Sequence, residues 1–174
     1  MKSKWIRTSG GPLVVASKIC ADIWMGVDGS SAGHTDSDYK LACDVEDYVD
    51  TIDCGGSKVL ILGDEPLQSA FFVVDDVLFV ARWVYCESYE LADSVIRTIP
   101  ASNPCELSGV QFLQNDSSMI LFDSATSLKF SNGDYSEINA PPGDYIVTTE
   151  SLRRDKSHEF IIHRFIRRNS SEKV

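Results

Sequence analysis

The sequence predicts an α+β fold in which antiparallel β-sheet dominates and about two short helices accompany it. Turn signals recur between apolar runs at intervals of roughly ten residues, which is typical of antiparallel strands. Two segments place their apolar residues at helical spacing. The length of 174 residues fits one domain, residues 1–174, and a tail from about residue 168 is expected to fray.

The first half of the chain is expected to supply most of the clearly marked strands, over 12–16, 57–63, 69–74 and 77–86. The run SKVLILG is apolar throughout, as in a strand buried on both faces. Asp75-Asp76 separates two runs rich in β-branched and aromatic residues, which indicates a hairpin turn. A short helix is expected within DYKLACDVEDYVDTI, residues 38–52, and Asp38 would act as its cap.

The second half is expected to contain one more helix, over 89–99, followed by strands. The runs 108–114 and 119–124 flank Asn115-Asp116, which favours a second hairpin turn. Asn132-Gly133 is the strongest turn dipeptide in the chain. Segments 140–154 and 158–168 are expected to form two closing strands.

Charge is the most unusual bulk property, because 26 acidic against 16 basic residues give a net charge of −10. Such a surface repels phosphate backbones, so direct nucleic-acid binding is not expected and a basic protein partner is favoured. Solubility alone is the alternative explanation. The acids concentrate in residues 22–53, whereas residues 151–174 are basic. These stretches either attract each other across the fold, or the acidic one is left for a partner.

No motif in the sequence predicts a metal, a cofactor or a catalytic set. The five cysteines lack zinc or redox spacing, so they are expected to be small buried residues in a reducing compartment. The loop from Asp28 has Ser30 and Ala32 where a calcium-binding EF-hand needs acids. The N-terminal apolar run is too short for a signal peptide or a membrane span, which predicts a cytoplasmic protein without membrane contact.

Several residues have both a structural and a functional interpretation. Gly10 and Gly11 either expose backbone amides to a partner or form a bend into the sheet, and the apolar run after Pro12 favours the bend. The stretch from Gly63 to Pro66 is either a turn or a functional loop at a strand end. Arg82 is expected to pair with a buried acid or to lie exposed, and Trp83 is expected in the core.

Four segments in this order resemble the immunity protein 21 family of bacterial polymorphic toxin systems. They are WIRTSGGPLVV, DSDYKLACDVEDYVDTIDCG, VLILGDEP and VLFVARWVY. The similarity covers residues 5 to about 85 well, and PPGDYIV is its best point in the later half. The motif residues Gly10, Gly11, Pro12, Gly63, Arg82 and Trp83 are interpreted as structural.

The resemblance implies a cytoplasmic, non-enzymatic protein that binds and neutralises a cognate toxin domain. That domain is expected to be basic, with a nuclease as one candidate, and the immunity protein to be a monomer or homodimer. The residues expected to contact the toxin are the acids of the loop and turn, with one aromatic anchor: Asp28, Asp36, Asp38, Asp47, Asp64, Glu65 and Trp24.

Two other classes of function stay open at this point. One is a small hydrolase with a site assembled from Asp64, Glu65 and His163, although a histidine within the run EFIIHRF is more often structural. The other is an adaptor subunit that associates through an exposed strand edge.

Overall fold

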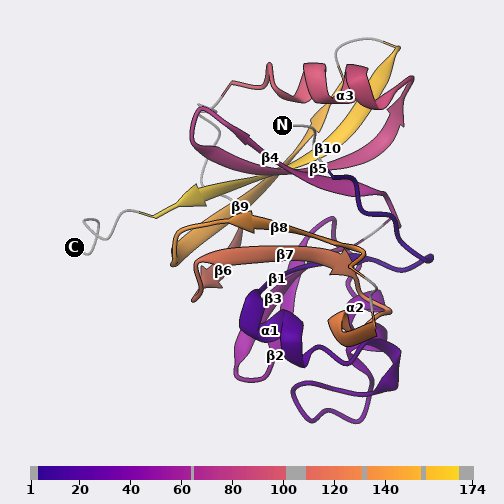
Figure 1. The fold of residues 1–174 in the computed structure, drawn as a ribbon, viewed down its shortest axis with the longest axis vertical. Helices are drawn as coiled ribbons and strands as arrows, with labels where there is room; N and C mark the ends of the chain where they lie inside the picture. Colours follow the sequence, from indigo (N-terminus) through magenta and orange to yellow (C-terminus); the bar gives the residue numbers. More distant parts are fainter. Residues whose placement is uncertain (1–3, 64, 101–108, 131–132, 154–155, 169–174) are drawn as a thin grey trace.

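Two five-stranded antiparallel sheets pack face to face in the computed structural model, which describes residues 4–63, 65–100, 109–130, 133–153 and 156–168 (Figure 1). The first sheet has the order β2 (Asp50–Cys54), β3 (Ser57–Leu62), β1 (Leu13–Ser17), β7 (Ser118–Asp123), β8 (Tyr135–Asn139). The second has the order β4 (Ser69–Val74), β5 (Val77–Cys86), β10 (His158–Arg167), β9 (Gly143–Leu152), β6 (Val110–Gln114). The predicted α+β class dominated by antiparallel sheet is confirmed.

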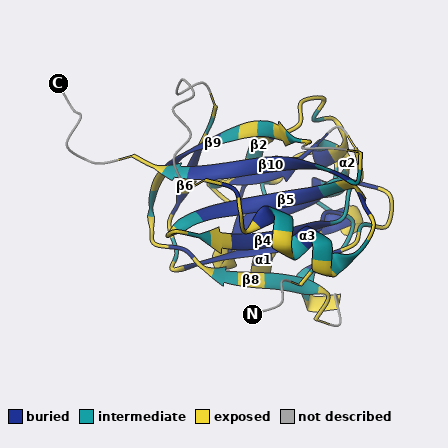
Figure 2. Ribbon diagram, turned by 90° about the horizontal axis from the view of Figure 1, so that it is seen from above, coloured by how far each residue is buried: buried dark blue, intermediate teal, exposed yellow. Residues whose placement is uncertain are grey.

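Each sheet is apolar on both faces, which explains why several strands read as continuous apolar runs. Leu13, Leu60 and Val80 belong to the core between the sheets. Neighbouring residues on the same strands, such as Val14 and Ile61, point to the outer face of the first sheet. The central strands β5 and β10 are therefore buried over most of their length (Figure 2).

Short helices cover both outer faces. The first sheet carries α1 (Lys18–Ile23) and α2 (Asp38–Cys43), and η2 (Leu128–Phe130) packs beside α1. The turn η1 (Gly26–Asp28) connects α1 to the loop before α2. The second sheet is covered by α3 (Tyr89–Ile96), which lies above it in Figure 1. The result is a helix–sheet–sheet–helix arrangement with three apolar layers.

The N-terminal segment explains the glycine pair before β1. Ile6 exchanges backbone hydrogen bonds with Ser69 at the edge of the second sheet, and β1 then begins at Leu13 in the first sheet. The segment between them must cross from one sheet to the other. Gly10 adopts a φ of +117°, and a Cβ on Gly11 would lie 2.5 Å from the Tyr39 ring. The structural interpretation of the glycines therefore accounts for both.

The predictions that were confirmed concern single elements and strands that pair with their neighbours in the sequence. Strands occur at all four ranges expected in the first half, and helices occur near both expected positions. The helix expected within 38–52 ends at Cys43, however, and the unpredicted strand β2 begins at Asp50 inside that range. Asp75 and Asp76 have φ of +47° and +64°, as the predicted hairpin between β4 and β5 requires. The segments expected to close the sheet form β9 and β10, and these two strands pair with each other.

Three details were wrong. Asn115-Asp116 does not form a hairpin, because β6 pairs with β9 in one sheet and β7 pairs with β1 and β8 in the other. The cap of α2 is Ser37, whose side chain accepts from the backbone N–H of Lys40, and Asp38 is the first helical residue. The helix α1 was not predicted. Asn132 and residues 169–174 of the expected tail lie outside the described residues.

Candidate functional site

Three of the four family segments meet at one groove of about 240 Å³. The crossing segment contributes Gly10, Gly11 and Pro12, the end of α2 contributes Ala42, Cys43 and Val45, and the connection from β3 to β4 contributes Gly63, Glu65 and Pro66. Two of the chain crossings between the sheets, the segment before β1 and the connection from β3 to β4, thus lie beside the end of α2. Sequence reasoning missed four lining residues, although each lies inside a quoted motif: Ala42, Cys43, Val45 and Pro66.

The fourth segment, VLFVARWVY, holds the lining of this groove in place from the protein interior through Arg82. Arg82 is fully buried on β5, so the alternative that placed it on an exposed face is excluded. Its guanidinium donates to the backbone carbonyls of Tyr48, at 3.0 Å, and Gly63, at 2.6 Å, and also to that of Glu65. Because Arg82 belongs to the second sheet and these carbonyls lie in loops beside the first, it links the two.

Gly63 leaves no room for a side chain. A Cβ there would collide with the backbone carbonyl of Asp47 and would lie 2.8 Å from the side chain of Val45. This close approach brings the loop after α2 against the end of β3. Asp47 and Glu65, both exposed and both predicted to contact a partner, therefore lie on segments that meet at the groove. Asp64 lies outside the described residues.

Asp38 is fully buried, which corrects the expectation that it faces a partner. Its carboxylate accepts from the backbone N–H of Met25 at 2.9 Å and from the backbone N–H and hydroxyl of Ser31. These bonds tie the loop between α1 and α2 to the start of α2. Asp38 thus organises the acidic segment without presenting its charge on the surface.

Trp24 is also buried, with 1% of its surface exposed, so the expectation that it anchors a partner is corrected. Its indole N–H donates to the carbonyl of Ser124 at 2.8 Å, and its ring packs edge-on against Phe122. The side chain fills the layer between α1 and the first sheet. Trp83 is half-buried in the aromatic cluster on the opposite side of the molecule.

The other acids of residues 22–53 stay at the surface. Three pair with nearby lysines, as Lys18–Asp22, Lys40–Asp44 and Lys58–Asp53. Within the described residues, five more are exposed and have no ion-pair partner: Asp28, Asp36, Glu46, Asp47 and Asp50. The lysine pairs are exposed and contribute little to stability. The surface over the first sheet therefore carries a net negative charge.

The basic C-terminal stretch lies in the second sheet and forms its ion pairs there. Arg153 pairs with Glu159, Arg164 with Glu150 and Arg168 with Asp144. Across the described parts of the chain, no ion pair joins this stretch to residues 22–53. The interpretation in which the two stretches neutralise each other is therefore not supported.

His163 is buried in the second sheet rather than placed at the groove. Thr149 lies within hydrogen-bond distance of its Nδ1, at 2.9 Å. Burial, followed by the nearby Arg82 charge, lowers the pKa of His163 to about 3, so the ring is neutral at physiological pH. The groove lined by Glu65 does not include His163. The positions of Glu65 and His163 therefore give no support to the proposed hydrolase site.

The cysteines divide into buried and exposed thiols. Cys20, Cys54 and Cys86 are buried as expected, but Cys43 is exposed at the groove. Cys105 lies outside the described residues. Among the residues that the structure describes, no group of three or more His, Cys, Asp or Glu side chains could hold a metal ion. The described helices are all too short or too polar to cross a bilayer.

Comparison with known proteins places the chain in a family. The family model described as Immunity protein 21 matches residues 4–158, which include the three segments that line the groove and the fourth that supports it. Curated proteins and solved structures give no significant match. The match covers most of the chain and extends well beyond the region in which the motifs are easiest to see. The chain therefore belongs to the Immunity protein 21 family.

Proposed function

We propose that this protein neutralises the toxin domain of a cognate polymorphic toxin system by binding it stoichiometrically in the cytoplasm. The observation that carries the proposal is the acidic surface over the first sheet, which the basic C-terminal stretch leaves unneutralised. An immunity protein acts through an interface and needs no catalytic residues of its own. Membership of the family supplies the functional class.

The charge of this surface favours a basic partner. The exposed carboxylates of Asp28, Asp36 and Asp47 raise the rate at which a positively charged domain encounters this face. A nuclease fits this description, because its substrate-binding surface must attract phosphates. Covering that surface would block the substrate directly. A specific complex of this kind buries about 1,600 Å² in total.

Growth rescue tests the proposal. The C-terminal domain of the protein encoded immediately upstream is expressed from an inducible promoter, with and without this chain. We expect the domain alone to stop growth and co-expression to restore it. Toxicity that this chain leaves unchanged would contradict the proposal for that pair.

Rescue alone does not distinguish binding from degradation or modification of the toxin. Co-purification of the two chains followed by light scattering measures the stoichiometry of the complex. We expect a defined complex with equal numbers of the two chains, and the same measurement on this protein alone separates a monomer from a homodimer. Rescue without any isolable complex would contradict stoichiometric binding.

A further inference from the structure

Exposed apolar side chains are concentrated on α1 and η1. Ten large apolar residues are exposed in the described parts of the chain, and four of them lie between residues 19 and 27. Ile19 is 63% exposed and Val27 is 56% exposed, with Ile23 and Met25 at 41% each. Single exposed apolar residues are ordinary on a protein surface, but a concentration of them in one short stretch marks an interaction site.

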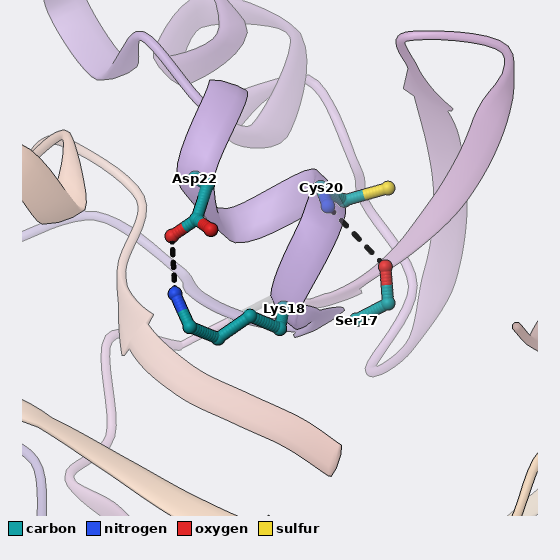
Figure 3. A network of polar contacts seen from close by, with 4 residues as sticks. All are labelled: Ser17, Lys18, Cys20 and Asp22. Atoms are coloured by element: carbon teal, nitrogen blue, oxygen red, sulfur yellow. Dashed lines mark hydrogen bonds and ion pairs between the residues drawn. The ribbon is translucent and has the colours of Figure 1, made fainter. Parts of the chain in front are cut away.

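The geometry of α1 sets the direction in which these residues face. Cys20, Ala21 and Trp24 point inward to the first sheet. Lys18 and Asp22 form an ion pair of 2.6 Å along one side of the helix, and Cys20 points away from that pair (Figure 3). Ile19 and Ile23 are four residues apart and share the remaining exposed side.

Glycines on neighbouring segments lie close against two of these side chains. The Cδ1 of Ile23 occupies the space that a Cβ on Gly55 would need, at the turn between β2 and β3. The side chain of Met25 lies in the same way against Gly29, with its Cε 2.8 Å from where a Cβ would stand. The apolar patch (Ile19, Ile23, Met25 and Val27) therefore extends from α1 toward the loop before α2 and the β2–β3 turn.

Acidic residues flank the patch in the sequence and on the adjoining elements. Asp28 ends η1 and Asp36 lies in the exposed loop that follows, and these two carry the negative charge of the rim. Asp53 lies next to the β2–β3 turn and pairs with Lys58, so this position adds no net charge. An apolar centre with a charged rim is the usual anatomy of a specific protein interface. The affinity of such an interface comes mainly from the centre, while the rim charges set the rate of encounter.

We propose that this patch is the centre of the contact with the toxin domain, and that the matching toxin surface has apolar residues surrounded by lysines and arginines. This inference rests on the proposed function and adds the location of the contact. Negative charge around the patch selects a basic partner and disfavours a second copy of this chain, whose net charge is also −10.

Paired substitutions on the two sides of the molecule test the location. The test variant is Ile19→Ser with Ile23→Ser, and the matched control is Val73→Ser with Leu113→Ser, which removes two similarly exposed apolar residues from the second sheet. The upstream-encoded toxin domain is made by cell-free synthesis, and its dissociation constant is measured for each variant. Circular dichroism and urea unfolding verify that each variant is folded.

We expect the dissociation constant to rise about thirtyfold or more for the test variant and to change less than about threefold for the control. A single change, Ile19→Arg, sets a positive charge against the basic partner at the most exposed position. It should weaken binding by a similar factor even if the double variant folds poorly.

Equal affinities for the wild type, the Ile19/Ile23 variant and Ile19→Arg would overturn the location while leaving the proposed function intact. Loss of binding in the Val73/Leu113 control instead would move the contact to the second sheet. A wild-type protein that does not bind the domain at all would contradict the proposed function itself, so the two failures are distinguishable.

Discussion

Both sheets have an apolar outer face that must be covered, and the two faces are covered by different kinds of residue. The outer face of the second sheet is closed by an aromatic cluster, in which Trp5 packs against Phe72, Trp83, Tyr89 and Phe160 beneath and beside α3. The outer face of the first sheet is closed by two six-residue helices and an acidic loop. Its exposed layer combines carboxylates with the apolar patch on α1 and η1.

The comparison indicates that the aromatic face mainly stabilises the fold, whereas the acidic face is available to the proposed partner. A compact aromatic layer buries apolar area efficiently and leaves little reason for a partner to bind there. The carboxylates presented by the short helices and the loop of the other face repel one another. This repulsion lowers the stability of the face, a cost that is consistent with the proposed recognition surface. The differences between the two faces can be tested one at a time.

The largest expected effect comes from removing Trp24, the largest buried side chain beneath the proposed recognition face. Trp24→Ala should lower the free energy of unfolding by about 3–5 kcal/mol, because the buried indole leaves a cavity and the Ser124 carbonyl loses its donor. Trp83→Ala should cost about 2 kcal/mol, because that side chain is half-buried. Urea unfolding measures both, and a smaller loss for Trp24→Ala would reverse the comparison.

The link between the sheets should give the next largest effect. Arg82→Met keeps the apolar volume of the side chain but removes the donors to the carbonyls of Tyr48, Gly63 and Glu65. The buried carbonyl of Gly63 and the part-buried carbonyls of Tyr48 and Glu65 would be left without this donor, and we expect a loss of about 3 kcal/mol in the free energy of unfolding. Arg82→Lys, which retains charge without the forked donors, should recover only part of this. Full stability in Arg82→Met would contradict a structural role.

Acid should destabilise the protein through His163. Its pKa is lowered to about 3 by burial and the Arg82 charge, whereas an unfolded histidine has a pKa near its ordinary value. The unfolded state therefore binds more protons below about pH 6.5, so stability falls as the pH falls from there toward 3. We expect a loss of about 2 kcal/mol between pH 6.5 and 5 from this group.

The variant His163→Met separates this contribution from the titration of the carboxylates. Urea unfolding of both proteins at pH 7 and pH 5 should give a smaller pH dependence for the variant. The same dependence in both would show that His163 is not the group responsible.

The smallest expected effect concerns the charge of the two faces. Asp28→Lys with Asp36→Lys should slow association with the toxin domain about tenfold at low salt and weaken its dependence on salt. Glu87→Lys with Asp144→Lys makes the same change of net charge on the second-sheet side and should have a smaller effect. Stopped-flow association at several salt concentrations compares them, and equal slowing would indicate attraction by net charge alone.

How far the sequence predicted this structure depends on whether the deciding contacts are local. The β4–β5 hairpin was predictable because Asp75 and Asp76 lie between the two strands that pair. Asn115-Asp116 carries the same signal, but the strands on its two sides join different sheets. The neighbour with which a strand pairs depends on residues far away in the sequence. A turn dipeptide carries no information about those residues.

The candidate site shows the same limit. Exposure of Asp28 and Asp36 followed from their loop composition, but burial of Asp38 and Trp24 depends on the fold around α1. That helix has only six residues, which is too short for a clear periodic signal. Its signals were the cap Ser17 and the inward spacing of Cys20, Ala21 and Trp24. Recognising them would have identified Ile19 and Ile23 as outward-facing.

Hydrogen–deuterium exchange on the wild-type protein, alone and with the upstream-encoded toxin domain, tests most directly whether the face over the first sheet is the recognition face. We predict that binding slows exchange in peptides covering residues 18–28 and in the loop before α2. Peptides from α3 and from β4 and β5 should change little. Protection confined to α3 and the second sheet would contradict the assignment of the recognition face.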